Sequence, residues 1–222
     1  TGKINHLFTL PFNWDVANLS ADEFVEQIIK RINPTVIYIG EDFRFGHNRT
    51  GSSQTLKEAG FETKSVTLKT DPQHGVISAT RIRGLIQSGH MIEVKTLLGR
   101  DWVIEGTVCK GDQRGRELGY PTANVPLEET IHPAYGVYAT YVRIEGETEW
   151  RMAATNIGIR PMFEVETALI EAHILDFSGD LYGKTLEIKP VAKIRNEEKF
   201  TSLEALIKQI EKDCDQCREI LA

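Results

Sequence analysis

The chain has 222 residues, 41% of them hydrophobic and 26% charged, which is ordinary for a folded globular protein. Its net charge of −6 argues against a protein that holds a nucleic-acid backbone, because such proteins carry excess lysine and arginine. No apolar run approaches the roughly 20 residues of a membrane span. Three cysteines cannot form a fully paired set of disulfides, so we expect a reducing, cytoplasmic location.

The chain opens with TGKINHLFTLPF, without an initiating methionine and without the basic start and apolar stretch of a secretory signal. We therefore expect it to be part of a longer protein.

Residues 1–99 alternate helix-like and strand-like segments. Ser20 is the predicted N-cap of the first helix, with Glu23 as its capping-box partner. Residues 35–40 (TVIYIG) are apolar on both faces, which is typical of a parallel strand covered on each side. Residues 61–68 form a second strand candidate, and residues 78–98 one or two helices broken near a glycine. This alternation predicts a doubly wound α/β arrangement.

From residue 100 the pattern changes to five or six strand candidates with no helix between them. This predicts an antiparallel sheet or barrel. A final helix is expected from Thr201, with Glu204 completing a capping box and an apolar stripe that packs on the outside of the barrel. Cys214 and Cys217 have C-x-x-C spacing within this helix, where packing is favoured over zinc binding or redox chemistry. The strand candidates are residues 102–110, 135–144, 150–158, 167–177 and 185–194.

Residues 111–124 read GDQRGRELGYPTAN, with glycines at every fourth position and arginines between them. Glycines let backbone N–H groups approach a phosphate, and successive amides can form an anion-binding nest. Thr122 offers a hydroxyl of the kind that binds Mg²⁺ in nucleotide sites, and Asn124 lies beyond it on the same strand face. On the spacing alone, a long glycine-rich hairpin with solvated arginines is an equal alternative.

This segment resembles the signature of riboflavin kinases, and three later segments resemble further motifs of that family in the same order. They are NIGIRPMF (156–163), EAHILDF with DLYG (171–177 and 180–183), and RNEEKF with SLEAL (195–200 and 202–206). One departure is Met162, where the family more often has threonine. The resemblance implies an antiparallel six-stranded β-barrel of the riboflavin kinase type with a C-terminal helix, over residues 100–222.

The implied reaction is the ATP-dependent phosphorylation of riboflavin to FMN, with Mg²⁺. Glu171 matches the family's catalytic base, although its alternation with Ile170 and Ala172 is also consistent with a solvated residue on an edge strand. Thr122 and Asn124 are the implied metal ligands, and Asn156 and Arg195 are assigned to flavin binding. The implied ATP- and phosphate-binding residues are Gly111, Gly115, Arg116, Gly119, Thr122 and Asn124.

Residues 1–99 resemble the C-terminal part of the Rossmann-like FMN adenylyltransferase (FAD synthetase) domain that bacteria fuse to this kinase, which implies FAD as a second product. ISATRIR (77–83) resembles its phosphate-binding helix start, with Ala79 where the family often has serine. No histidine lies in the H-x-G-H motif of the fused enzymes, so we expect only the kinase reaction from this chain. The implied remnants of the adenylyltransferase site are Asp42, Phe43, Arg44, Ser78, Thr80 and Arg83.

Two other functions remain open. A non-catalytic flavin-binding barrel, acting as a sensor or carrier, would bind flavin without turning over ATP. A nucleic-acid-binding barrel is disfavoured by the acidic charge and by the lack of a helix-turn-helix signal, so we expect no nucleic-acid or membrane partner. The sequence leaves homo-oligomer formation open.

Overall fold

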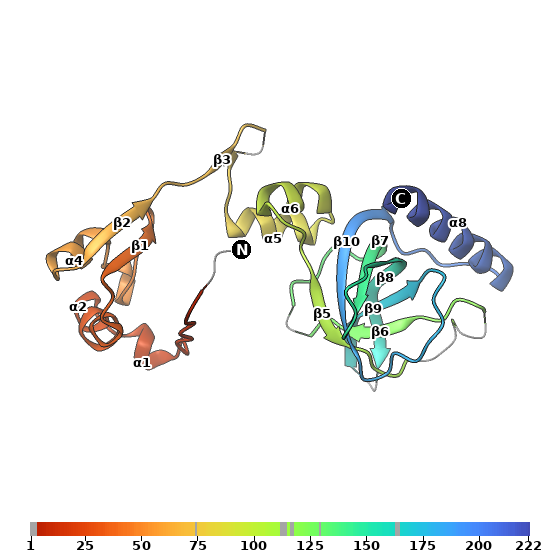
Figure 1. The fold of residues 1–222 in the computed structure, drawn as a ribbon, viewed down its shortest axis with the longest axis horizontal. Helices are drawn as coiled ribbons and strands as arrows, with labels where there is room; N and C mark the ends of the chain where they lie inside the picture. Colours follow the sequence, from red (N-terminus) through yellow and green to blue (C-terminus); the bar gives the residue numbers. More distant parts are fainter. Residues whose placement is uncertain (1–3, 74, 112–114, 116–117, 129, 163–164) are drawn as a thin grey trace. The chain divides into compact units, whose positions relative to one another are not determined.

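The computed structural model divides the chain into two compact units, Thr1–Val76 and Ile77–Ala222, and each is described by itself. The structure describes residues 4–73, 75–111, 115, 118–128, 130–162 and 165–222, with the backbone alone at 160–162 and 165–167. Figure 1 traces the elements of both units. Within these ranges no helix is long and apolar enough to cross a membrane.

The first unit is built around two parallel strands with a helix in the connection between them. The strands pair from Val36–Glu62 to Gly40–Val66, and the buried side chains of Val25, Ile39, Phe45 and Leu56 form the core. Its elements are α1 (Trp14–Ala17), α2 (Ala21–Phe24), the π-helical η1 (Val25–Ile29), α3 (Lys30–Ile32), β1 (Val36–Gly40), the 3₁₀ turn η2 (His47–Arg49), α4 (Ser53–Glu58), β2 (Glu62–Val66), β3 (Thr70–Asp71) and β4 (Gly75–Val76).

Local sequence signals explain this unit well. The Ser20 hydroxyl accepts from the Glu23 backbone N–H at 3.2 Å, and the Glu23 carboxylate accepts from the Ser20 N–H at 2.8 Å, which confirms the predicted capping box. The parallel pairing of β1 is also confirmed. Its predicted burial on both faces is wrong for Tyr38, which is 66% exposed, whereas the other residues of β1 are buried or half-buried.

The second unit is a six-stranded antiparallel barrel, as predicted. The strand order is β5-β10-β7-β8-β9-β6, and the two edge strands meet where the Cys109 N–H donates to the Asn124 carbonyl at 2.8 Å. The elements are α5 (Ala79–Gln87), α6 (Met91–Leu98), β5 (Ile104–Thr107), β6 (Ala123–Pro126), β7 (Gly136–Ile144), β8 (Arg151–Met162), β9 (Val165–Ile174), β10 (Thr185–Arg195) and α8 (Leu203–Leu221).

The barrel interior holds one large apolar core. Aliphatic side chains from every strand fill it, and Thr140 and Thr155 pair their buried hydroxyls at 2.7 Å. Helices α5 and α6 add Ile86, Met91 and Val94 to the same core, so they pack with the barrel. The contact-based division at Val76 therefore differs from the domain boundary of 99/100, which stays a prediction.

Helix α8 packs on the outside of the barrel (Figure 1), as its apolar stripe predicts. Cys214 and Cys217 are buried there against Ala139, Ala154 and Leu175. Burial raises the pKa of Cys214 to about 11 and that of Cys217 to about 12, so both are packed, neutral thiols. The N-cap lies one residue later than predicted: Ser202 is the cap, and its hydroxyl accepts from the Ala205 N–H at 3.2 Å.

Candidate active site

The candidate site is a row of side chains that crosses the barrel at one level. In the strand register, Asn124 of β6 pairs with Glu171 of β9, which pairs with Asn156 of β8. The row continues through Val137 of β7 to Arg195 of β10. Residues directly opposite each other in a sheet share a face, so these side chains point outward, away from the core.

Strand β9 separates the core from the site residue by residue. Ile170, Ala172 and Ile174 are at most 4% exposed and belong to the barrel core. Glu171 and His173 alternate with them and line a pocket on the opposite face. This is the alternation predicted from the sequence, and it places Glu171 in a cavity wall.

A pocket of about 560 Å³ lies along this row and beside α8. Its wall combines carboxylates and amides with apolar and aromatic side chains. The lining includes Gly111, Gly115, Leu118, Tyr120, Thr122, Asn124, Asn156, Glu171, His173, Arg195, Glu197, Phe200, Leu206, Ile210 and Asp213.

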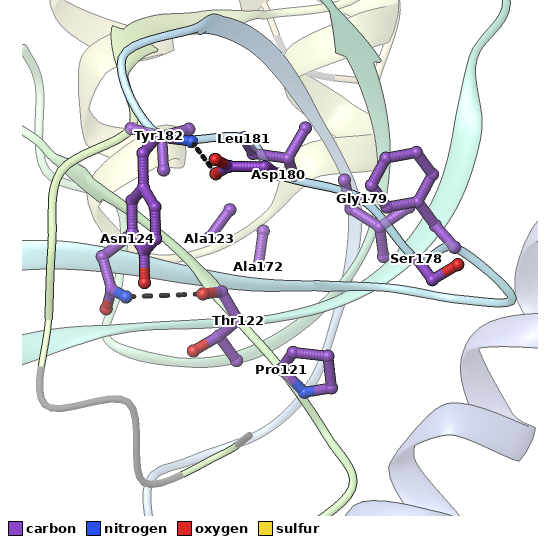
Figure 2. Close-up of a pocket in the computed structure, with 13 residues that line it drawn as sticks. Pro121, Thr122, Ala123, Asn124, Ala172, Ser178, Gly179, Asp180, Leu181 and Tyr182 are labelled. Carbon is purple, nitrogen blue, oxygen red and sulfur yellow. Dashed lines mark hydrogen bonds between the residues drawn. The ribbon is translucent and has the colours of Figure 1, made fainter.

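A smaller pocket of about 270 Å³, shown in Figure 2, is formed by β6, β9 and the turn that precedes β10. Thr122 and Asn124 line both pockets, whereas Glu171 lines only the larger one. The smaller pocket contacts β9 through Ala172 and Ile174, on the strand face opposite to Glu171. Its other walls come from Val108, Pro121, Ala123, Phe177, Ser178, Gly179, Asp180, Leu181 and Tyr182.

The segment from Pro121 to Asn124 is held in place by side-chain contacts. The His173 Nδ1 lies 2.9 Å from the Pro121 carbonyl oxygen. A carbonyl oxygen can only accept, so Nδ1 is the donor in this hydrogen bond. The Tyr120 ring meets His173 edge-on at 5.4 Å. Partial burial, with the Glu211 carboxylate nearby, raises the pKa of Tyr120 and keeps its phenol neutral.

Asn124 is oriented by its own neighbourhood. Its Nδ2 donates to the Thr122 carbonyl at 3.4 Å (Figure 2). The backbone of Gly111 passes so close that a Cβ there would lie 2.7 Å from the Asn124 Cγ. Gly111 is therefore needed for close approach to Asn124, the predicted metal ligand on β6.

The other residues of the predicted phosphate loop are placed only in part. Gly115 lines the larger pocket, and its carbonyl accepts from the Tyr120 N–H at 2.8 Å. Gly119 lies in the turn before Tyr120 and is not among the lining residues of either pocket. Arg116 lies outside the described residues.

Two carboxylates meet at one amide beside the base candidate. The Nδ2 of Asn156 lies 3.2 Å from Oε2 of Glu171 and 3.2 Å from Oε1 of Glu197. An amide nitrogen donates and a carboxylate accepts, so Asn156 donates to both. Its predicted flavin contact remains a prediction, while the structure gives this amide a contact with the base candidate.

Arg195 is tied to helix α8. Its Nε lies 2.9 Å from Oδ1 of Asp213 and its Nη2 lies 2.7 Å from Oδ2, in a bidentate ion pair. Gln209 donates to the same carboxylate at 2.8 Å. The guanidinium therefore forms part of the pocket wall with its charge paired, and the flavin contact predicted for it is untested.

Sequence reasoning missed Glu197 and Asp213. Asp213 lies four residues after Gln209 on α8, beside the apolar stripe, and is 4% exposed. A charged residue next to a buried stripe indicates an ion pair in the core, and that was the available signal. Glu197 has no comparable signal, because it follows the last strand in a loop without periodicity.

The predicted adenylyltransferase remnants lie in different units. Asp42, Phe43 and Arg44 follow β1, and the Phe43 ring stacks on Phe45 at 5.8 Å. In the second unit, Ser78 caps α5 by accepting from the Arg81 N–H at 3.2 Å, which confirms the predicted helix start. On the same helix, Arg83 Nη2 donates to Thr80 Oγ1 at 3.3 Å. The phosphate contacts of these residues stay predictions.

Comparison with known proteins agrees with this geometry. The riboflavin kinase family model matches residues 98–221, and the FAD synthetase model matches residues 1–81. A bifunctional riboflavin kinase/FMN adenylyltransferase from Escherichia coli K12 is 36% identical over 97% of this chain and 70% of its own length. The same enzyme from Haemophilus influenzae is 35% identical over 97% of this chain and 71% of its own. The chain belongs to the bifunctional riboflavin kinase/FMN adenylyltransferase family.

A solved structure from Streptococcus pneumoniae shares the fold of this family member. It is 36% identical, with a TM-score of 0.82, and the match covers 93% of this chain and 67% of that one. That protein is described as a macrolide-efflux protein. The two family models and the curated bacterial enzymes agree with each other on flavin chemistry.

Proposed function

We propose that the barrel transfers the γ-phosphoryl group of ATP to the 5′-hydroxyl of riboflavin, which yields FMN and ADP. One observation carries the assignment: Thr122 and Asn124 line both pockets, and Glu171 lines only the larger one. A phosphoryl donor in one pocket and an acceptor hydroxyl in the other would therefore meet at β6, beside the Glu171 carboxylate.

Riboflavin is assigned to the larger pocket. Leu118, Tyr120, Phe200, Leu206 and Ile210 offer an apolar and aromatic wall of the kind that a flat ring system stacks on. Amide and hydroxyl side chains of the same pocket, from Asn124, Thr122 and Tyr120, suit the ribityl hydroxyls, which donate and accept hydrogen bonds. The acceptor hydroxyl is then expected beside Glu171.

ATP is assigned to the smaller pocket. Val108, Phe177, Leu181 and Tyr182 provide apolar and aromatic contacts for the adenine ring. Gly111 and Gly115 line the larger pocket next to Thr122, where their backbone amides would approach the terminal phosphates. The phosphates are thus expected along β6, between the two pockets.

Glu171 is assigned as the general base. As the ribityl oxygen bonds to the γ-phosphorus, the bond from that phosphorus to the bridging oxygen breaks and ADP leaves. The hydroxyl proton passes to the Glu171 carboxylate, which the Asn156 amide orients at 3.2 Å. Backbone amides near Gly111 would stabilise charge on the transferred group.

The residues present suit Mg²⁺. The Thr122 hydroxyl and the Asn124 amide are oxygen donors, and Mg²⁺ in phosphoryl-transfer sites takes one or two protein oxygens together with substrate phosphates. The Asn124 Nδ2 is directed to the Thr122 carbonyl, which leaves Oδ1 as the amide atom for a cation. When bound, Mg²⁺ would neutralise charge on the ATP phosphates.

The segment matched by the FAD synthetase model is assigned to the adenylylation of FMN, which gives FAD in the family's bifunctional enzymes. Asp42, Phe43 and Arg44 after β1, and Ser78, Thr80 and Arg83 at the start of α5, are the proposed contributors. We place this biosynthetic chemistry in the cytoplasm, in line with the unpaired, reduced cysteines.

A chromatographic assay of this chain with riboflavin, ATP and MgCl₂ tests the assignment. We expect FMN and ADP in equal amounts, with no FMN when ATP is omitted. Tight riboflavin binding without ATP turnover would instead support the non-catalytic flavin-binding barrel. FAD in the same chromatogram would show that the adenylyltransferase reaction also proceeds on this chain.

A further inference from the structure

We propose that Glu197 is a positioning residue for the base Glu171, and that it acts through the side-chain amide of Asn156. This rests on the proposed kinase reaction and adds to it a residue from the loop that follows β10. The juxtaposition is specific: one amide nitrogen lies 3.2 Å from a carboxylate oxygen of each glutamate.

The side-chain amide of Asn156 connects the two glutamates, because both hydrogen bonds come from its single nitrogen, Nδ2. Its two N–H groups diverge from Nδ2, so one can point to Glu171 and the other to Glu197. With the second N–H held by Glu197, rotation of the amide about its last torsion is restricted. The first N–H then stays directed at Oε2 of the base.

The backbone is built to admit Glu197 at this point. A Cβ on Gly158, two residues beyond Asn156 on β8, would lie 2.3 Å from Oε1 of Glu197. Glycine therefore leaves the space that the carboxylate occupies. A side chain at residue 158 would displace the same oxygen that accepts from Asn156.

The loop that carries Glu197 is anchored on its N-terminal side. Arg195, two residues earlier, is joined to Asp213 on α8, and its Nη1 donates to the Asn196 carbonyl at 2.9 Å. The Asn196 side chain accepts from Lys193 at 2.7 Å. These contacts limit the positions available to Glu197 without touching the base.

Burial by substrate strengthens the arrangement. Glu197 is exposed in the structure, where water competes for its hydrogen bonds. It lines the larger pocket together with Glu171 and Asn156, so a flavin bound there would remove that water. Hydrogen bonds to ionised groups become stronger when water is excluded, and the orientation of the base improves in the complex.

The test is steady-state kinetics of the wild-type chain, Glu197→Ala, Asn156→Ala and the double variant, with Glu219→Ala at the far end of α8 as the matched control. We expect Glu197→Ala to lower kcat about fivefold to thirtyfold, with KM for riboflavin within about twofold of wild type. Glu197→Gln keeps an acceptor oxygen and should retain most of the activity. In the Asn156→Ala background, the Glu197→Ala change should have almost no effect.

Additive losses in the double variant, or a higher KM with unchanged kcat, would overturn the positioning role and indicate direct substrate contact by Glu197. If Glu197→Ala fails to fold, Gly158→Ala provides a second test, because it displaces the same carboxylate and should reproduce the kcat loss. Wild-type kcat in that folded variant would contradict the proposal. If wild type itself forms no FMN, the kinase assignment fails, which is distinguishable from wild type being active and Glu197→Ala unchanged.

Discussion

The guanidinium of Arg195, at the end of β10, forms a two-point ion pair with the buried carboxylate of Asp213 on α8. The Asp213 side chain is 5% exposed and the Arg195 side chain 18% exposed. This pair joins the last strand of the barrel to the helix that walls the larger pocket. Removing either partner leaves a charge that is largely shielded from water.

We therefore expect Asp213→Ala to lower the free energy of unfolding by about 3–5 kcal/mol, because it leaves the Arg195 charge unpaired. Urea denaturation measures this loss. Asp215→Ala, two residues along α8, removes an exposed partner of Arg218 and should change stability little. The double variant Arg195→Met/Asp213→Leu should regain most of the loss. Equal stabilities for Asp213→Ala and Asp215→Ala would contradict the role of the pair.

Gly111→Ala tests the close approach of the glycine loop to β6. The new Cβ would lie 2.7 Å from both Cγ and Nδ2 of Asn124, so the amide must move. We expect kcat/KM to fall about tenfold to a hundredfold, since small displacements of positioned groups are costly in catalysis. Gly84→Ala is the matched control: nothing lies within 4 Å of its new Cβ, and kinase activity should be unchanged. Equal activity of the two variants would remove the argument for Gly111.

The assignment of ligands to the two pockets predicts that two aromatic-to-alanine substitutions each weaken the binding of a different ligand. Tyr182→Ala, in the smaller pocket, should raise KM for ATP about fivefold to a hundredfold, the range for loss of a base-stacking contact. Phe200→Ala, in the larger pocket, should raise the Kd for riboflavin and leave KM for ATP unchanged. Fluorescence quenching of riboflavin measures the second. The reverse pattern would exchange the two ligands between the pockets.

The buried thiols predict a loss of stability at alkaline pH. The pKa is raised from 9.0 to about 11 for Cys214 and about 12 for Cys217, because burial disfavours the thiolate. The folded state thus holds protons that the unfolded state releases, so this contribution is complete below pH 9 and is lost as pH rises toward 11–12. Urea titrations from pH 8 to 11 should show a shallower decline in Cys214→Ala/Cys217→Ala. The same slope in both proteins would contradict this account.

Much of the barrel could be predicted because its sequence patterns are local. The alternation of Ile170, Glu171 and Ala172 predicts Glu171 on the face opposite the core, and the strand register brings Asn156 beside it. The N-cap of α8 was misplaced by one residue because Thr201 and Ser202 are both competent caps.

Other contacts could not be predicted, because they depend on tertiary packing. The hydrogen bond from Asn156 to Glu197 joins residues 41 apart, and Glu197 lies in a loop without periodicity. Likewise, the apolar faces of α5 and α6 do not specify which unit buries them, and Ile86 and Val94 pack into the barrel core. Periodicity shows that a face is buried and leaves its partner undetermined.

The most direct test of the central claim is a single-turnover measurement of FMN formation by wild type and Glu171→Gln, with riboflavin binding followed in parallel. We predict that the variant binds riboflavin with nearly wild-type affinity and forms FMN about 100-fold to 10,000-fold more slowly, because it lacks the carboxylate that accepts the hydroxyl proton. FMN formation at the wild-type rate by Glu171→Gln would contradict the assignment of the base and the transfer geometry built on it.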